Sequence, residues 1–219
     1  WAANGPDPTG YRDSAVVVLH AGSSDGSCSV LPGCATRKYH SSRRDAFKPI
    51  NQEPIAHVSL GPDGPSIEMG EPSAYDARTE AISPMMFDES TRIAQFVADA
   101  HLQPDMVQAA IDADYDALLF HGTGLGHLPI ADPQEDSPEN TRLRVMLADH
   151  CAGGGVVVVV TQTIHGPIHM DVYDKGRDQQ EMGIIGHGSL CPPSSALVKL
   201  HHLLSRDEGR DAVAEGWEQ

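Results

Sequence analysis

Residues 156–160 are five consecutive valines, and this run constrains the fold of the chain more than any other feature. Valine is β-branched and favours strands, and a strand that is apolar at every position has both of its faces buried. Such strands are typical of parallel sheets that are covered by helices. The run therefore predicts an α/β fold with residues 156–160 as a strand inside its sheet.

The segments on either side of the valines alternate between strand and helix patterns. Residues 92–98 and 117–120 indicate strands, a helix opens at Pro104, residues 141–152 are amphipathic, and a last helix begins near Pro192. This alternation predicts a parallel sheet with right-handed crossovers. The apolar residues at helical spacing are Met106, Ala109 and Ala110 in the first helix, Leu143, Val145, Met146 and Leu147 in the second, and Ala196, Leu197, Leu200 and Leu204 in the last.

The first part of the chain has a different pattern. Residues 15–60 contain strand segments and turns, and segments 27–33 and 35–40 are expected to be the arms of a hairpin. A stretch rich in Pro, Gly and acidic residues follows without a sustained period, as in a linker. The expected parts are residues 1–65, a linker at 66–90, and a second, smaller α/β domain at 91–219.

The charge of the chain limits its partners. It has 31 acidic and 15 basic residues, which gives a formal net charge of −16. Such a chain repels nucleic acids and anionic membranes, and it has no apolar run of the roughly 20 residues that span a bilayer. We therefore expect no direct nucleic-acid binding and no membrane span. A halophilic, cytoplasmic origin would account for the acidity, and a merely acidic mesophilic protein is the alternative.

Three glycines at alternate positions, Gly122, Gly124 and Gly126, follow the strand at 117–120 directly. Glycine-rich turns after a parallel strand lie at the carboxyl edge of the sheet and let backbone approach a ligand closely. The spacing is not that of a dinucleotide-binding G-x-G-x-x-G motif, and Pro129 stands where a phosphate-binding helix would start. The turn is either a small-molecule site or a tight connection without a ligand.

Other motifs exclude several kinds of chemistry. The four cysteines show no C-x-x-C spacing, and the serine in GHGSLC lacks the G-x-S-x-G spacing of a nucleophile elbow. His121 and His127 flank the glycines, and His165 and His169 are four apart, but no H-E-x-x-H motif or third ligand lies nearby in the sequence. We therefore expect no metal site.

Three segments together resemble the asparaginase/glutaminase family. They are TRKYHSSRRDAFKPINQEPIAHV, LLFHGTGLGHLP, and the region from VVVVVTQTIHG through VYDKGRD to the end of the last helix. Within the family, these segments are most similar to the D subunits of archaeal glutamyl-tRNA(Gln) amidotransferases, including halophilic ones. The resemblance implies the end of an N-terminal α/β catalytic domain, followed by a smaller C-terminal domain with a parallel sheet flanked by helices.

The resemblance also implies a function and partners. It implies an amidohydrolase that releases ammonia from glutamine or asparagine, and a homodimer formed through the asparaginase-like domains. In the D-subunit case, the E subunit of the amidotransferase would carry the tRNA site and use ATP and Mg²⁺ to convert Glu-tRNA(Gln) to Gln-tRNA(Gln). No cofactor is expected in this chain.

Two residues are candidates for the site by this resemblance. The catalytic lysine of the family matches Lys38, and the hydroxyl of Thr123, among the glycines, is expected to face substrate or a subunit interface. The nucleophile motifs of the family, Thr-Gly-Gly-Thr and Gly-Thr-Asp-Thr, do not occur in the 219 residues, which begin with Trp1. The isolated chain is therefore expected to be an inactive fragment. The alternatives are a fragment of a free-standing L-asparaginase and a non-catalytic binding remnant.

Overall fold

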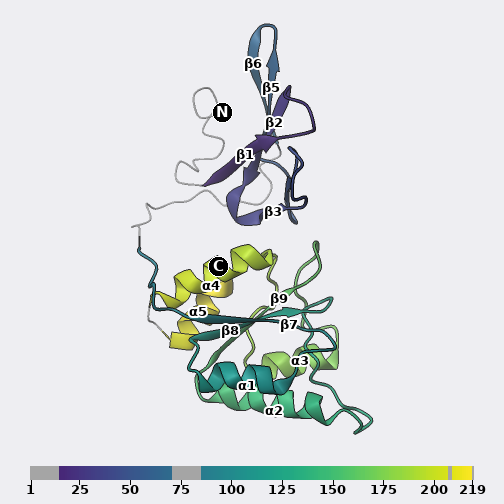
Figure 1. Cartoon of the computed structure of the whole chain (residues 1–219), viewed down its shortest axis with the longest axis vertical. Coiled ribbons are helices and arrows are strands. Elements are labelled where there is room, and N and C mark those ends of the chain that lie inside the picture. The colour runs from purple at the N-terminus through teal and green to yellow at the C-terminus, as the bar shows by residue number, and fades with distance from the viewer. Residues whose placement is uncertain (1–14, 71–84, 207–208, 219) are drawn as a thin grey trace. The chain divides into compact units, whose positions relative to one another are not determined.

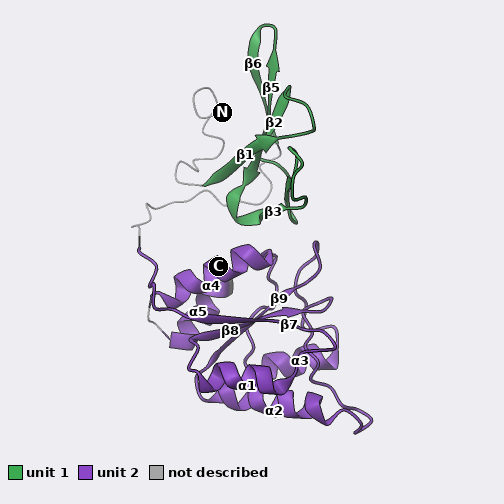
Figure 2. Ribbon diagram, viewed as in Figure 1, with its two compact units in different colours: residues 1–84 green, residues 85–219 purple. Residues whose placement is uncertain are grey.

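The computed structural model describes residues 15–70, 85–206 and 209–218. The chain divides into two compact units, Trp1–Pro84 and Met85–Gln219, which are coloured separately in Figure 2. None of the helices in the described residues has the length and hydropathy of a segment that crosses a bilayer.

The described residues of the first unit are built from strands. Four strands form an antiparallel sheet in the order β1-β2-β5-β6, and β3 pairs with β4 in a separate hairpin. Val30 and Leu31 of β2 are apolar residues of this sheet with side chains that are 0% and 1% exposed. The strands are β1 (Val16–His20), β2 (Ser27–Pro32), β3 (Thr36–Lys38), β4 (Phe47–Pro49), β5 (Ala56–Gly61) and β6 (Gly64–Met69), with a 3-10 turn at Gly33–Ala35.

Two expectations for this unit change. Segments 27–33 and 35–40 do not form one hairpin, because β2 pairs with β1 and β5 whereas β3 pairs with β4. The linker boundary expected at residue 66 falls inside β6, which pairs with β5 along its whole length. The two strands join through a tight turn between Gly61 and Gly64, where Pro, Asp and a glycine with φ of 109° supply the usual turn residues.

The second unit is a three-layer α/β structure (Figure 1). Its sheet is parallel with the order β7-β8-β9, so the chain moves across it in one direction. Right-handed crossovers then place α1 and α2 on the same face, and α4 and α5 cover the other. The elements are β7 (Ile93–Val97), α1 (Pro104–Asp112), β8 (Ala117–Gly122), α2 (Pro138–Ala152), β9 (Val156–Thr161), α3 (Asp174–Glu181), α4 (Pro193–Leu204) and α5 (Gly209–Glu218).

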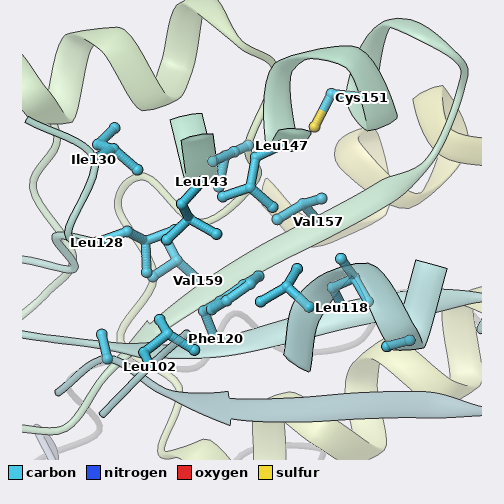
Figure 3. Close-up of a cluster of buried hydrophobic side chains, with 14 of the residues drawn as sticks. Leu102, Leu118, Phe120, Leu128, Ile130, Leu143, Leu147, Cys151, Val157 and Val159 are labelled. Carbon is cyan, nitrogen blue, oxygen red and sulfur yellow. The ribbon is translucent and has the colours of Figure 1, made fainter. Parts of the chain in front are cut away.

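The two cores of this unit lie on opposite faces of the same strands. Leu118 and Phe120 of β8 pack with alternate valines of β9 against Leu143 and Leu147 of α2 (Figure 3). The intervening residues of both strands pack against α4 and α5. All six residues of β9 are buried, and its outer edge is paired by backbone hydrogen bonds with Ile185. The predicted fold class, α/β with a C-terminal parallel sheet flanked by helices, is confirmed.

The helices in this unit differ from the predicted pattern in detail. Met106 and Val145 have apolar side chains at helical spacing, but these side chains are 54% and 53% exposed. The buried positions of α1 are Pro104, Val107 and Ala110. The apolar pattern did not predict two of the helices, α3 and α5.

Candidate functional site

The glycine-rich turn at the end of β8 folds back on itself. The backbone N–H of Thr123 donates to the carbonyl of His127 over 2.9 Å, and the N–H of His127 donates to the carbonyl of Thr123 over 2.9 Å. A Cβ on Gly122 would lie 2.6 Å from the backbone of Gly126, so this close approach requires glycine. The turn is therefore a closed, self-paired loop at the carboxyl edge of the parallel sheet.

The last residue of β9 and the two residues after it fix the tip of this loop. The hydroxyl of Thr161 donates to the carbonyl of Gly124 over 2.6 Å and lies 2.8 Å from the hydroxyl of Thr163. The side-chain amide of Gln162 donates to the carbonyls of Ala98 and His121, each over 2.8 Å, and so joins the ends of β7 and β8. The carboxyl edge is therefore held by side chains of the TQT sequence that follows the valine run.

Gln179 of α3 fixes the other side of the loop. Its side chain is fully buried, its carbonyl oxygen accepts the N–H of Leu128 over 2.8 Å, and its amide donates to the carbonyl of Gly126 over 3.0 Å. These two hydrogen bonds hold the backbone on both sides of His127, at Gly126 and at Leu128. Sequence reasoning missed this residue because a glutamine in a polar segment gives no signal of burial.

His127 is the buried polar residue that this clamp positions. Its side chain is 6% exposed, and its Nε2 has no hydrogen-bond partner within the described residues. Its ring meets the ring of Tyr173 edge to face, with centroids 5.4 Å apart. Burial lowers the pKa of His127, and the positive charge of Lys175 lowers it further. The imidazole is therefore held neutral, with an unused polar atom.

His127, Tyr173 and Lys175 line a cavity of about 530 Å³ between the glycine loop, α2 and the start of α3. This volume lies within the range of small-molecule sites. Arg144, also in the lining, forms an ion pair with Asp178 over 3.1 Å. Lys175 forms no ion pair with any residue that the structure describes, so its ammonium and the imidazole of His127 are available to a polar ligand. Asp132, Asp174 and Asp178 also line the cavity.

The two site residues expected from the sequence lie in different units: Lys38 in the first and Thr123 in the second. Thr123 is exposed, and its hydroxyl donates to the carbonyl of His127 over 3.2 Å. Lys38 is the last residue of β3, pairs with Phe47 and is exposed, with its Nζ 5.7 Å from the centroid of the Phe47 ring. The fold thus places Thr123 in the loop that carries His127.

A cluster of possible metal ligands lies in loops of the same unit. One donor atom from each of His169, Asp171 and His187 lies within 4.8 Å of the other two, and all three side chains are exposed. The sequence paired His169 with His165, which is not a member of this cluster, and gave no third ligand near that pair. The structure instead joins His169 to Asp171 and to His187, which is 18 residues further along the chain.

Comparisons with known proteins bear on this site. Residues 92–215 match the family model of the glutaminase/asparaginase C-terminal domain. The D subunit of a glutamyl-tRNA(Gln) amidotransferase from Methanosarcina mazei is 34% identical over 203 residues, which is 91% of this chain and 43% of that protein. The corresponding D subunit from Haloquadratum walsbyi is 30% identical over 84% of this chain and 38% of its own length.

The fold also matches solved structures. The thermostable L-asparaginase from Thermococcus kodakarensis superposes with a TM-score of 0.67 and 23% identity, over 87% of this chain and 53% of that one. At this identity the likeness concerns the fold alone. The chain spans less than half the length of the two amidotransferase relatives.

Proposed function

Because this chain belongs to the glutaminase/asparaginase family through its C-terminal domain, we propose that it is part of an amidohydrolase that releases ammonia from the side-chain amide of glutamine or asparagine. The observation that carries this proposal is the match to the family model over residues 92–215, which include the whole glycine loop and its clamp. The chemistry is proposed for the whole protein, because this chain spans less than half the length of the amidotransferase relatives.

We further propose that the whole protein is the D subunit of a glutamyl-tRNA(Gln) amidotransferase. The support comes from relatives of that name, which align with as much as 91% of this chain. In this role the released ammonia passes to an E subunit that carries the tRNA site and uses ATP and Mg²⁺. A formal charge of −16 suits a chain that leaves tRNA binding to its partner.

The second unit has a binding role in this proposal. Its cavity offers the ammonium of Lys175 and the neutral imidazole of His127 to a ligand that carries carboxylate and amide groups. Thr123 lies in the same loop, where its hydroxyl faces either the substrate or the interface of a homodimer. The clamp by Gln179 keeps this loop in a fixed position, which favours binding because little freedom is lost when the ligand arrives.

Lys38 has a proton-transfer role in this proposal. The attacking group of the family is a threonine hydroxyl, which is a weak nucleophile until a neighbouring base or relay accepts its proton. Lys38 is the member of that relay found in this chain. Since the 219 residues contain neither threonine nucleophile motif, we propose that they do not hydrolyse amides alone.

The test is an assay of the intact protein that contains this chain, purified with its cognate E subunit. With glutamine labelled at the side-chain nitrogen, the D-subunit role predicts that the label reaches Gln-tRNA(Gln) only when Glu-tRNA(Gln), ATP and Mg²⁺ are present. Hydrolysis of asparagine without tRNA or a partner would instead identify a free-standing asparaginase. Ammonia release by the isolated 219 residues would refute their proposed inactivity.

A further inference from the structure

The segment that precedes α3 presents two possible metal ligands on the same side. Ile168 and Met170 are 1% and 0% exposed, whereas His169 and Asp171 are exposed. Because the side chains of Ile168 and Met170 are buried, His169 between them and Asp171 after them are the ones that face solvent. The common orientation of His169 and Asp171 thus follows from the burial of their apolar neighbours.

A second segment is fixed beside the first by backbone hydrogen bonds. The N–H of Ile168 donates to the carbonyl of Ser189, and the N–H of Gly188 donates to the carbonyl of Ile168, each over 2.9 Å. His169 is also tied to the glycine loop, because its N–H donates to the carbonyl of Leu125 over 3.1 Å. This pairing brings His187 to the outward side, where its ring meets that of His169 with centroids 5.3 Å apart.

We infer that His169, Asp171 and His187 form a binding site for a divalent transition-metal ion, for which Zn²⁺ is the best match. Their donor atoms lie within 4.8 Å of one another. The Nε2 of His187 is 3.5 Å from Oδ2 of Asp171, which is long for a hydrogen bond. Ligand atoms about 2.0–2.1 Å from a tetrahedral zinc ion are themselves roughly 3.4 Å apart, close to that separation.

The carboxylate is already oriented for this role. The side-chain amide of Gln180 donates to Oδ1 of Asp171 over 2.9 Å and leaves Oδ2 for an ion. Partners of this kind commonly orient ligands from outside the coordination shell. An aspartate carboxylate is an anion at neutral pH, so Oδ2 brings negative charge to the ion.

One hydrogen bond changes when the ion binds. The N–H of Met170 donates to Nδ1 of His187 over 3.1 Å, which places the proton of the neutral ring on Nε2. Coordination through Nε2 moves this proton to Nδ1, and the N–H of Met170 then loses its acceptor. The lost bond weakens the site, and the amide of Met170 becomes a specific reporter of binding.

The donor set defines the class of ion. Two imidazoles and one carboxylate suit Zn²⁺ and its neighbours in the first transition row better than Mg²⁺ or Ca²⁺, which prefer oxygen ligands. Three protein ligands on an exposed surface leave a coordination position for water. None of its three residues lines the cavity that contains His127, so the metal site is separate from that cavity.

The test is a calorimetric titration of the intact chain with Zn²⁺, repeated with His187→Gln and Asp171→Asn. The matched control is His101→Gln, which removes an exposed histidine from the loop after β7. We expect one ion to bind the wild type, both site variants to lose more than about tenfold in affinity, and the control to bind as the wild type does. Thermal melts of the apo proteins identify any variant that fails to fold.

The amide of Met170 gives a second measurement. In ¹H–¹⁵N spectra its proton resonance should move upfield as Zn²⁺ is added, because its hydrogen bond is lost, and should stay in place in folded Asp171→Asn. Failure of the wild type to bind Zn²⁺ would overturn the assignment. Equal affinity in the wild type and both site variants would do so too, since the ion would then occupy other ligands.

Discussion

Gln179 is the residue on which the glycine loop depends most directly. Leucine has a similar volume, so Gln179→Leu should keep the packing and leave the N–H of Leu128 and the carbonyl of Gly126 buried without partners. Each such group costs about 1–3 kcal/mol, so the free energy of unfolding should fall by about 2–6 kcal/mol. Urea unfolding of the intact chain measures this loss.

The control for this substitution is Gln108→Leu on α1. The side chain of Gln108 makes one hydrogen bond, to the exposed Asp112, over 2.8 Å. Its loss should change the free energy of unfolding by no more than about 0.5 kcal/mol. Similar losses in both variants would show that Gln179 does not hold the loop.

His127 and His150 make the stability of the second unit depend on pH. Burial lowers the pKa of both from the ordinary value of 6.5, so the folded state binds fewer protons than the unfolded state as the pH falls. Their contribution is complete above pH 6.5 and is lost as the pH falls through the folded pKa. The free energy of unfolding should therefore decrease as the pH falls below 6.5.

Urea unfolding between about pH 8 and about pH 5 checks this expectation. The double variant His127→Gln, His150→Gln should show a flatter dependence, and His101→Gln, which changes an exposed histidine, should keep the slope of the wild type. An unchanged slope in the double variant would contradict the assignment of the pH dependence to these two residues.

Among the elements, α2 shows how burial follows the period of the helix. Leu143, Leu147 and Cys151 are four residues apart and lie on the buried face, whereas Val145 is two residues from Leu143 and lies about 200° around the axis. The prediction for Leu143 and Leu147 is confirmed, and that for Val145 is wrong. Val145 was predicted to be buried because it is apolar. Its position around the helix axis, on the side opposite Leu143, instead places it in solvent.

The same helix supplies a matched pair of substitutions. Leu147→Ala should lower the free energy of unfolding by about 2–5 kcal/mol, because it leaves a cavity in the core between α2 and the sheet. Val145→Ala should change it by no more than about 0.5 kcal/mol, because this side chain is 53% exposed. Denaturant unfolding of both variants makes the measurement, and equal losses would contradict this orientation of α2.

The helix α3 could not be predicted from its residues. Its sequence, DKGRDQQE, has no apolar side chain, so no hydrophobic period marks an inner face. Instead it packs through Gly176, where a Cβ would lie 2.3 Å from the carbonyl of Met170, and through buried Gln179. Hydrophobic periodicity gives no signal for a helix that packs through a glycine and a buried side-chain amide.

For the whole molecule, the dominant property is a formal charge of −16. Repulsion among like charges opposes the compact state, and salt screens it with a Debye length of about 10 Å at 0.1 M and about 3 Å at 1 M. Thermal unfolding temperature should therefore rise with KCl, and the isolated chain should aggregate or oligomerise in dilute buffer. Melts and light scattering across a KCl series test both, and a monomeric sample that melts cooperatively in dilute buffer would contradict the second.

The sequence predicted only some of the residues of the candidate site. The glycine loop was identified from its place after a predicted strand and Thr123 from the family resemblance, and the structure puts both at the carboxyl end of β8. Tyr173 and Lys175 were not, because they reach the cavity from the start of an unpredicted helix. The roles of Lys38 and Thr123 stay predictions.

The sequence by itself determined the parallel sheet, because a run of valines and the 3.6-residue period of α2 and α4 are local patterns that record which faces are buried. Only the tertiary structure decided that Gln179 grips a loop 51 residues away and that His187 joins His169 and Asp171. Polar contacts between distant segments leave no period in the sequence. They depend on which backbone groups the packed elements bring within hydrogen-bonding distance.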